Sequence, residues 1–184
     1  MYSKETIENI IVNCQQIEQG VKELSQGLDE FKQSMEKQPS FVQPFVKRDF
    51  ESGVGLSIEE LKRLLGHLAT CFTEIENDLK QLEAACNKKE SETEISTAIT
   101  KLKDTSKSFP NAANVVIKMV SNLITYLQSL PDKIDMIPQQ FLNNDERKSL
   151  LQLMPVYQDK ARALLQLFVI MQDQLDLLIH TLAN

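Results

Sequence analysis

The sequence predicts an all-α protein, an elongated antiparallel bundle of about four to six helices in which three helices are long. Two observations predict this fold class. Apolar side chains recur at alternating intervals of three and four residues over three long stretches, which is the heptad-type seam of helices that pack side by side. The chain also has only five glycines and six prolines, and they are clustered. At a length of 184 residues, we expect a single domain, 1–184.

The first long helix is predicted from about Lys4 to about Glu36, with Ser3 as its N-cap. Its apolar seam consists of Ile7, Ile10, Cys14, Ile17, Val21, Leu24, Leu28, Phe31 and Met35. Gly20 and Gly27 lie seven residues apart on the line beside this seam. Because a glycine inside a helix costs roughly 1 kcal/mol relative to alanine, two on one line predict a close-packed neighbouring helix.

Residues 37–57 interrupt this pattern with two prolines and two glycines, yet they remain apolar. A connection of this kind is uncommon as a plain loop, and we expect it to contain a short helix. Two interpretations stay open. The segment is a lid that buries its phenylalanines at one end of the bundle, or it docks a partner through aromatic and arginine anchors. The partner-binding residues in the second interpretation are Phe41, Phe45, Lys47, Arg48 and Phe50.

The second long helix has the clearest start signal in the chain. Ser57 and Glu60 have the spacing of a capping box, in which each side chain bonds the backbone of the other residue. The seam that follows keeps the alternating spacing through Ile58, Leu61, Leu65, Leu68, Phe72, Ile75, Leu79, Leu82 and Cys86. We therefore expect an unbroken helix that ends near the Lys88–Lys89 pair.

Two further helices are predicted in the middle of the chain. Ser91 and Glu94 form another capping-box pattern, which opens a shorter helix to about Lys107. A more hydrophobic helix is expected from about Asn111 to Leu130, where the next residue is a proline.

The last helix is predicted from about Asn144 to about Leu182, with Pro155 inside it. Its apolar seam continues across this proline, which favours one kinked helix over two separate helices. The helix is apolar on nearly every side, so it is either central in the bundle or carries a partner surface, and we favour the central position. Val169 and Ile170 are the candidate patch for self-association in the second case.

Charge and cysteine usage exclude several classes of function. The formal net charge is −6, which disfavours broad binding to nucleic acid or to anionic lipid. The three cysteines have no CxxC spacing, so neither a disulfide framework nor a zinc site is expected. The N-terminus has no signal-peptide profile, and no run of apolar residues has the length of a membrane span. We expect a cytoplasmic protein of the producing cell, or of a host cell after export without a cleaved signal.

No catalytic motif emerges from the sequence. Neither His67 nor His180 has the glutamate three residues before it that a di-metal carboxylate bundle requires. No cysteine has a histidine at a suggestive spacing, and no glycine-rich phosphate loop is present. We therefore expect no catalytic residues, no metal, no cofactor and no small-molecule substrate.

The function predicted from these observations is non-enzymatic protein–protein interaction by a helical bundle of the adaptor, scaffold or effector type. The partner is another protein or a second copy of the chain, and a membrane partner is disfavoured. The alternative is a lipid- or membrane-acting helical protein that rearranges at a bilayer.

Overall fold

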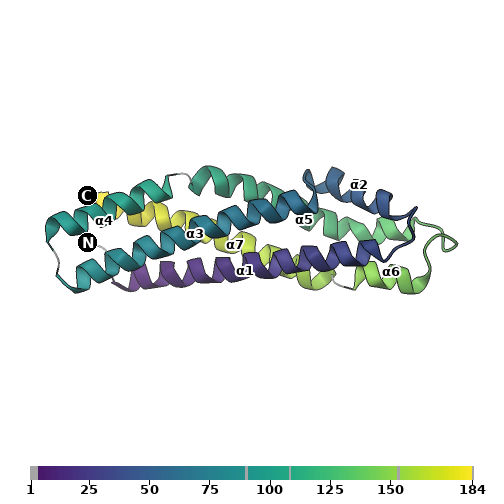
Figure 1. Cartoon of the computed structure of the whole chain (residues 1–184), viewed down its shortest axis with the longest axis horizontal. Helices are drawn as coiled ribbons and strands as arrows, with labels where there is room; N and C mark the ends of the chain where they lie inside the picture. Colours follow the sequence, from purple (N-terminus) through teal and green to yellow (C-terminus); the bar gives the residue numbers. More distant parts are fainter. Residues whose placement is uncertain (1–3, 90, 108, 153, 184) are drawn as a thin grey trace.

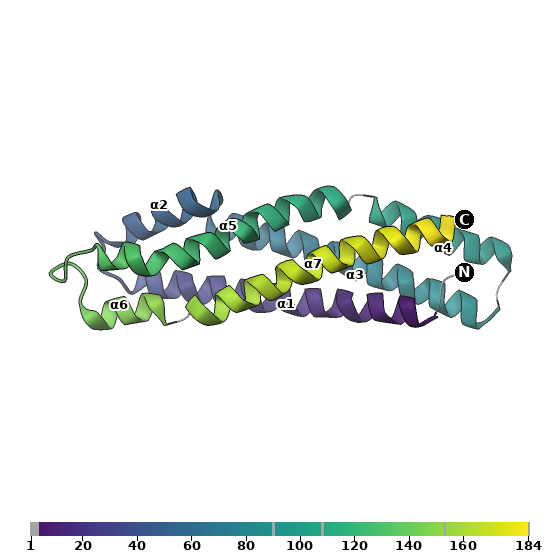
Figure 2. The same ribbon diagram turned by 180° about the vertical axis from the view of Figure 1, so that it is seen from behind.

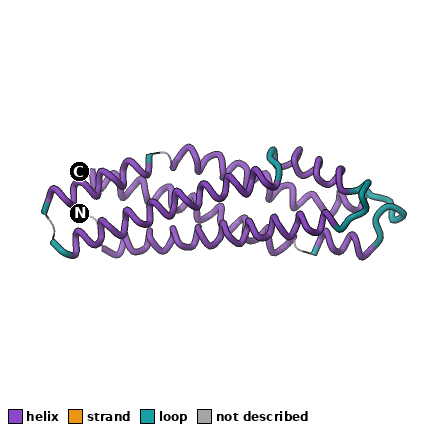
Figure 3. Tube along the Cα trace, in the orientation of Figure 1, coloured by secondary structure: helices purple, strands orange, loops and turns teal. Residues whose placement is uncertain are grey.

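The computed structural model describes residues 4–89, 91–107, 109–152 and 154–183, and its regular elements in these ranges are all helices (Figure 3). The predicted all-α bundle is confirmed. The helices are α1 (Lys4–Glu36), α2 (Gln43–Val54), α3 (Ile58–Asn87), α4 (Glu92–Ser106), α5 (Phe109–Asp135), α6 (Asn144–Leu151) and α7 (Met154–Ala183).

The long helices α1, α3, α5 and α7 lie along one axis and give the molecule the shape of a rod (Figure 1). α1 packs mainly against α3 and α7, and α5 packs against α7, α2 and α3. Both ends of the described chain lie near α4, at one end of the rod, while α2, α6 and the connection 136–143 lie at the other end (Figure 1).

The predicted seams of α1 and α3 form the interior of the rod. Every predicted seam residue of these two helices is buried except Cys86, which is half-buried. Midway along the rod, Phe72 lies between two aromatic rings, with ring centroids 5.0 Å from Phe109 and 6.0 Å from Phe168. This aromatic cluster joins α3, α5 and α7. The buried seams of α1 and α3 show that the alternating spacing in the sequence correctly predicts which of their residues form the core.

Gly20 and Gly27 of α1 lie against α7, which confirms that a closely packed helix lies beside them. A Cβ atom added at Gly20 would lie 3.1 Å from the Leu164 Cδ1 atom. At Gly27 an added Cβ would overlap the ring of Tyr157. The two missing side chains therefore let the backbones of α1 and α7 approach each other closely.

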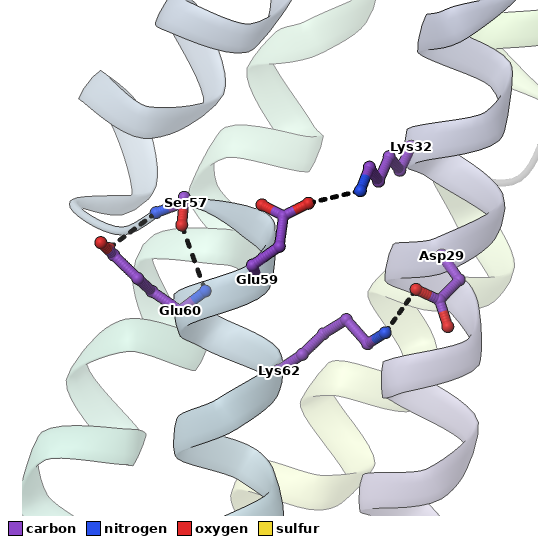
Figure 4. Close-up of polar contacts among 6 residues, drawn as sticks. All are labelled: Asp29, Lys32, Ser57, Glu59, Glu60 and Lys62. Carbon is purple, nitrogen blue, oxygen red and sulfur yellow. Dashed lines mark hydrogen bonds and ion pairs between the residues drawn. The ribbon is translucent and has the colours of Figure 1, made fainter.

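Both predicted capping boxes are present. Ser57 Oγ accepts a hydrogen bond from the Glu60 N–H at 3.1 Å, and the Glu60 carboxylate accepts one from the Ser57 N–H at 3.1 Å (Figure 4). The start of α3 is also tied to α1 by ion pairs, since Glu59 binds Lys32 at 2.6 Å (Figure 4). The other box, at Ser91, opens α4. The predicted N-cap of α1, Ser3, lies outside the described residues.

The irregular segment 37–57 contains the short helix that was expected, α2. Pro44 lies in its first turn, where a missing N–H costs no intrahelical bond. Gly55 ends the helix with a left-handed φ of 90°, and its N–H donates to the Glu51 carbonyl at 2.9 Å.

Two prolines act differently from the prediction. α5 continues through Pro131 to Asp135 instead of ending at Leu130, because Ile134 in its last turn is buried and gains apolar contacts there. Pro155 does not kink a continuous last helix. α6 ends at Leu151 and α7 begins at Met154, so Pro155 lies in the first turn of a new helix, where proline is tolerated. The single kinked helix was therefore a wrong prediction.

Candidate functional site

The exposed apolar side chains fall into two groups on the rod. Ten large hydrophobic side chains are exposed among the described residues. One group gathers at the end of the rod that holds α2, and it consists of Phe41, Phe45, Met136 and Phe141. The second group consists of Val156, Val169, Ile170 and Leu177 on α7 and Val12 on the neighbouring helix α1. Val115 on α5 belongs to neither group. Exposed apolar clusters of this kind mark interaction sites more often than isolated exposed residues do.

The first group lines a groove between α2, the last turns of α5 and the connection that follows α5. The groove has a volume of about 650 Å³. Its buried floor is made by Val42, Val46, Leu130 and Ile134, and its rim by the four exposed side chains. Asp49 and Lys133 add an ion pair at 3.0 Å across one side. We call this feature the end groove.

The periodicity of α2 explains which of its residues reach the end groove. Val46, Phe50 and Val54 recur every four residues and are buried, so this row of α2 faces α5. Phe41 and Phe45 each come directly before a buried valine, so they lie at the edge of this row. Their side chains are 51% and 67% exposed. Phe41 meets Phe141 edge to face across the groove, at a centroid distance of 5.6 Å.

The candidate residues of segment 37–57 therefore separate into three environments. Phe41 and Phe45 line the end groove. Lys47 and Arg48 are exposed on α2 but do not line it. Phe50 is buried, with its ring 5.7 Å from Phe31 and 5.2 Å from Tyr126, so it is a core residue and not a contact residue. The lid interpretation therefore holds for Phe50, which is buried, whereas docking through Phe41 and Phe45 stays a prediction.

Arg147 holds the second wall of the end groove in place. Its Nη1 donates to the Ile134 carbonyl at 2.5 Å, its Nη2 to the Ile137 carbonyl, and its Nε to the Leu142 carbonyl at 3.0 Å. The last carbonyls of a helix lack intrahelical partners, and they carry partial negative charge. The guanidinium on α6 thus caps α5 and fixes the connection that carries Met136 and Phe141.

Sequence reasoning missed the wall formed by Met136, Ile137 and Phe141. These residues lie far from α2 in the sequence, and no periodic pattern links the two segments. Composition was the available signal, because the stretch from Pro131 to Asn143 contains several apolar residues and two prolines, Pro131 and Pro138, just as segment 37–57 contains two prolines among apolar residues.

The second candidate patch lies on α7, where Val169 and Ile170 are 48% and 46% exposed. The expected central position of α7 is wrong, because this helix lies on one side of the rod and packs mainly against α1 and α5 (Figure 2). Its segment Pro155–Thr181 is long and apolar enough to cross a membrane, and only 28% of its most apolar window is buried. So much apolar surface left free on one helix is typical of an interaction site.

A polar cluster crosses the interface of α1 and α3. The Glu76 carboxylate accepts hydrogen bonds from Lys80 Nζ at 2.6 Å and Gln15 Nε2 at 3.0 Å. Burial alone would raise the pKa of Glu76, but these bonds hold it below its ordinary value. Burial is also the main cause that raises the pKa of Glu18, which accepts a hydrogen bond from Thr73 at 2.6 Å. Because these groups bond one another on a packed face, the cluster serves to join two helices.

The remaining reactive side chains are dispersed. His67 and His180 are exposed. Burial raises the pKa of the Cys14 and Cys71 thiols, which makes both cysteines weaker nucleophiles near neutral pH. Across the part of the chain that the structure describes, no three or more His, Cys, Asp or Glu side chains gather to hold a metal ion.

Comparison of the chain with protein-family models, curated proteins and solved structures gives no significant match.

Proposed function

We propose that this chain is a non-enzymatic interaction protein whose end groove receives an amphipathic helix of a partner protein. The observation that supports the proposal is the convergence of four exposed apolar side chains on one groove with a buried apolar floor. Helices commonly bind partner proteins by laying an apolar face into a hydrophobic groove. Aromatic and methionine side chains suit this role because they offer a large and adaptable contact area.

The energy available from the rim supports specific binding. A buried phenylalanine removes about 200 Å² from water. Since 67% of Phe45 is exposed, a partner would bury roughly 130 Å² more, which is worth ~3 kcal/mol at about 25 cal/mol per Å². The costs of association reduce this gain, but side chains of this kind are typical interface hot spots.

A site-specific photo-crosslinking experiment tests the proposal. A photoreactive amino acid is placed at Phe45 in the end groove, and at Val115 as a control of similar apolar character on α5. We expect defined protein adducts in the producing cell from position 45 and none from position 115, and Phe141→Ala should lower the adduct yield about tenfold or more. Equal labelling at both positions, or no adduct at position 45, contradicts the proposal.

The alternative function is action on lipid or on a membrane surface, and it has support from one observation. α7 has the length and apolar character of a membrane segment and is largely uncovered in the rod. Against this, Arg162, Asp173 and Asp176 interrupt the segment and cost free energy within a bilayer. Sedimentation with neutral and anionic vesicles tests the alternative, because a membrane-acting protein would co-sediment with at least one of them.

A further inference from the structure

The short helix α2 packs on the rod through one of its faces and lies at the edge of the molecule (Figure 1). Its buried row consists of Val46, Phe50 and Val54 and faces mainly α5. The opposite face is exposed and carries Arg48 and Ser52. A helix of 12 residues has little stability of its own in water, so α2 stays helical because it packs on this surface.

Both ends of α2 are turns that lie outside the long helices. At the N-terminal end, Gln43 Nε2 donates to the Glu36 and Gln38 carbonyls at 3.0 and 2.8 Å, so the end of α1 holds this turn. At the C-terminal end, Gly55 has a φ of 90°, and the capping box at Ser57 begins α3 shortly afterwards. Backbone rotations within two such turns move the helix between them and leave α1 and α3 in place.

Two polar contacts add to the apolar row that holds α2 on α5. Lys133 Nζ lies 3.0 Å from the Asp49 carboxylate, and Asn122 Nδ2 donates to the Val54 carbonyl at 3.1 Å. The two charged side chains are 42% and 37% exposed, so water weakens their attraction. The closed position of α2 therefore depends chiefly on the burial of its apolar row.

A tyrosine beneath α2 has a buried hydroxyl group without a partner. Tyr126 on α5 is 2% exposed, and its hydroxyl makes no hydrogen bond within the described part of the chain. Its ring lies 5.2 Å from the ring of Phe50 on α2 and 6.4 Å from that of Phe31 on α1, between centroids. A Cβ atom added at Gly53 of α2 would lie 2.9 Å from the Tyr126 Cδ2 atom. Because most of these neighbours belong to α2, the tyrosine meets water when α2 moves away.

The unpartnered hydroxyl destabilises the closed position of α2. A hydroxyl group gives up its hydrogen bonds to water when it is buried, and no group of the described chain replaces them for Tyr126. Burial, and then the negative charge of Asp49, raise the pKa of this hydroxyl, so it keeps its proton. The hydroxyl of Tyr157, in contrast, donates to the Glu30 carboxylate. The Tyr126 hydroxyl thus favours opening, and the apolar row of α2 favours closure.

We propose that α2 is a lid that opens from α5 as a unit while the long helices stay packed, and that the buried hydroxyl of Tyr126 raises the population of the open form. Opening brings Tyr126 into water and uncovers Leu130 and Ile134, the part of the end-groove floor that belongs to α5. The end groove therefore has a closed and an open form. The opening needs no partner, so it stands or falls separately from partner binding in the end groove.

Native-state amide hydrogen exchange of the full chain, followed by mass spectrometry, tests the lid. In the unaltered chain, the amides of α2 should exchange at least tenfold faster than the seam amides of α1 and α3, because α2 opens locally. Tyr126→Phe removes the unpartnered hydroxyl and keeps the ring, so exchange in α2 should slow about tenfold. Gly66→Ala adds a methyl group that meets nothing within 4 Å, so it should slow exchange in α3 and leave α2 unchanged.

Tyr157→Phe is the matched control, because it removes a hydroxyl that has a partner, and it should not slow exchange in α2. Exchange of α2 at the rate of α1 and α3 in the unaltered chain overturns the proposal, since α2 then opens only when the whole chain unfolds. Unchanged exchange of α2 in Tyr126→Phe overturns it as well. Faster exchange in that variant also overturns it and shows that an ordered water satisfies the hydroxyl when α2 is closed.

Discussion

Substitution of the helical glycines by alanine would measure how closely α1 and α7 approach each other. Gly27 and Gly66 both lie inside long helices, but their surroundings differ. A Cβ atom added at Gly66 meets nothing within 4 Å, whereas at Gly27 it would overlap the ring of Tyr157. Gly20 is intermediate, because its nearest neighbour is the terminal methyl group of Leu164 at 3.1 Å.

The expected free energies follow from two opposing effects. Alanine gains about 0.5–1 kcal/mol over glycine inside a helix, at any of these positions. Overpacking of a filled contact costs typically 1–3 kcal/mol. Gly66→Ala should therefore stabilise the protein by about 0.5–1 kcal/mol, and Gly20→Ala should be nearly neutral, since a methyl group can shift. Gly27→Ala should destabilise it by about 1–2 kcal/mol, because an aromatic ring has to move.

Urea unfolding followed by circular dichroism supplies the three free energies of unfolding. Tyr157→Leu in the Gly27→Ala background should recover part of the loss, because it removes the ring that the new methyl group meets. If Gly27→Ala stabilises the chain as much as Gly66→Ala does, α7 does not pack closely against this face of α1.

Three further predictions concern individual contacts. Arg147→Lys keeps the charge but loses the forked donor, so amide exchange in residues 136–142 should accelerate and the free energy of unfolding should fall by about 1–3 kcal/mol; unchanged exchange would show that the guanidinium does not hold the connection. Ser57→Ala should lower the free energy of unfolding by about 1 kcal/mol, and Ser57→Gly by only a few tenths; equal losses in urea titrations would contradict the role of the cap. The raised pKa of Glu18, caused mainly by burial, means that its contribution to stability is present at acidic pH and is lost as the pH rises through its folded value. Glu18→Gln should therefore unfold at a higher urea concentration than the unaltered chain at pH 7, with the difference vanishing below the ordinary range of a glutamate; a difference independent of pH would exclude this explanation.

Much of the fold could be predicted because its determinants are local or periodic. The alternating spacing of Ile, Leu and Phe puts these side chains on one face of each helix. That face is buried when the helix packs against its neighbours. Capping boxes at Ser57 and Ser91 act over three residues, so they can be recognised without tertiary information. Gly20 and Gly27 predicted a close neighbour correctly, although the sequence did not identify it as α7.

Other features depend on contacts that no local pattern encodes. The sequence predicts a continuous helix through Pro155 because the apolar seam keeps its spacing there. That spacing does not show whether the backbone between two seam residues is helical. The end groove brings Phe45 together with Phe141, which lies far from it in the sequence, and only the packing of α2 on α5 makes them neighbours. Phe45 and Phe50 are phenylalanines of the same short helix, yet Phe50 lies on the buried row of α2 and Phe45 lies one position before that row.

The exposed apolar residues of α7 are different, since their signal is present in the sequence. A helix that is apolar all round was interpreted as central, but each long helix of this rod has only a few neighbours, and an outward face remains whatever the composition. The useful comparison is between equivalent positions. Where α1 has Gln16 and Glu23, α7 has Ala163 and Ile170, and the neighbouring seam residues are apolar in both helices. Burial within the chain accounts for the seams of both. It does not account for the outward-facing apolar residues of α7.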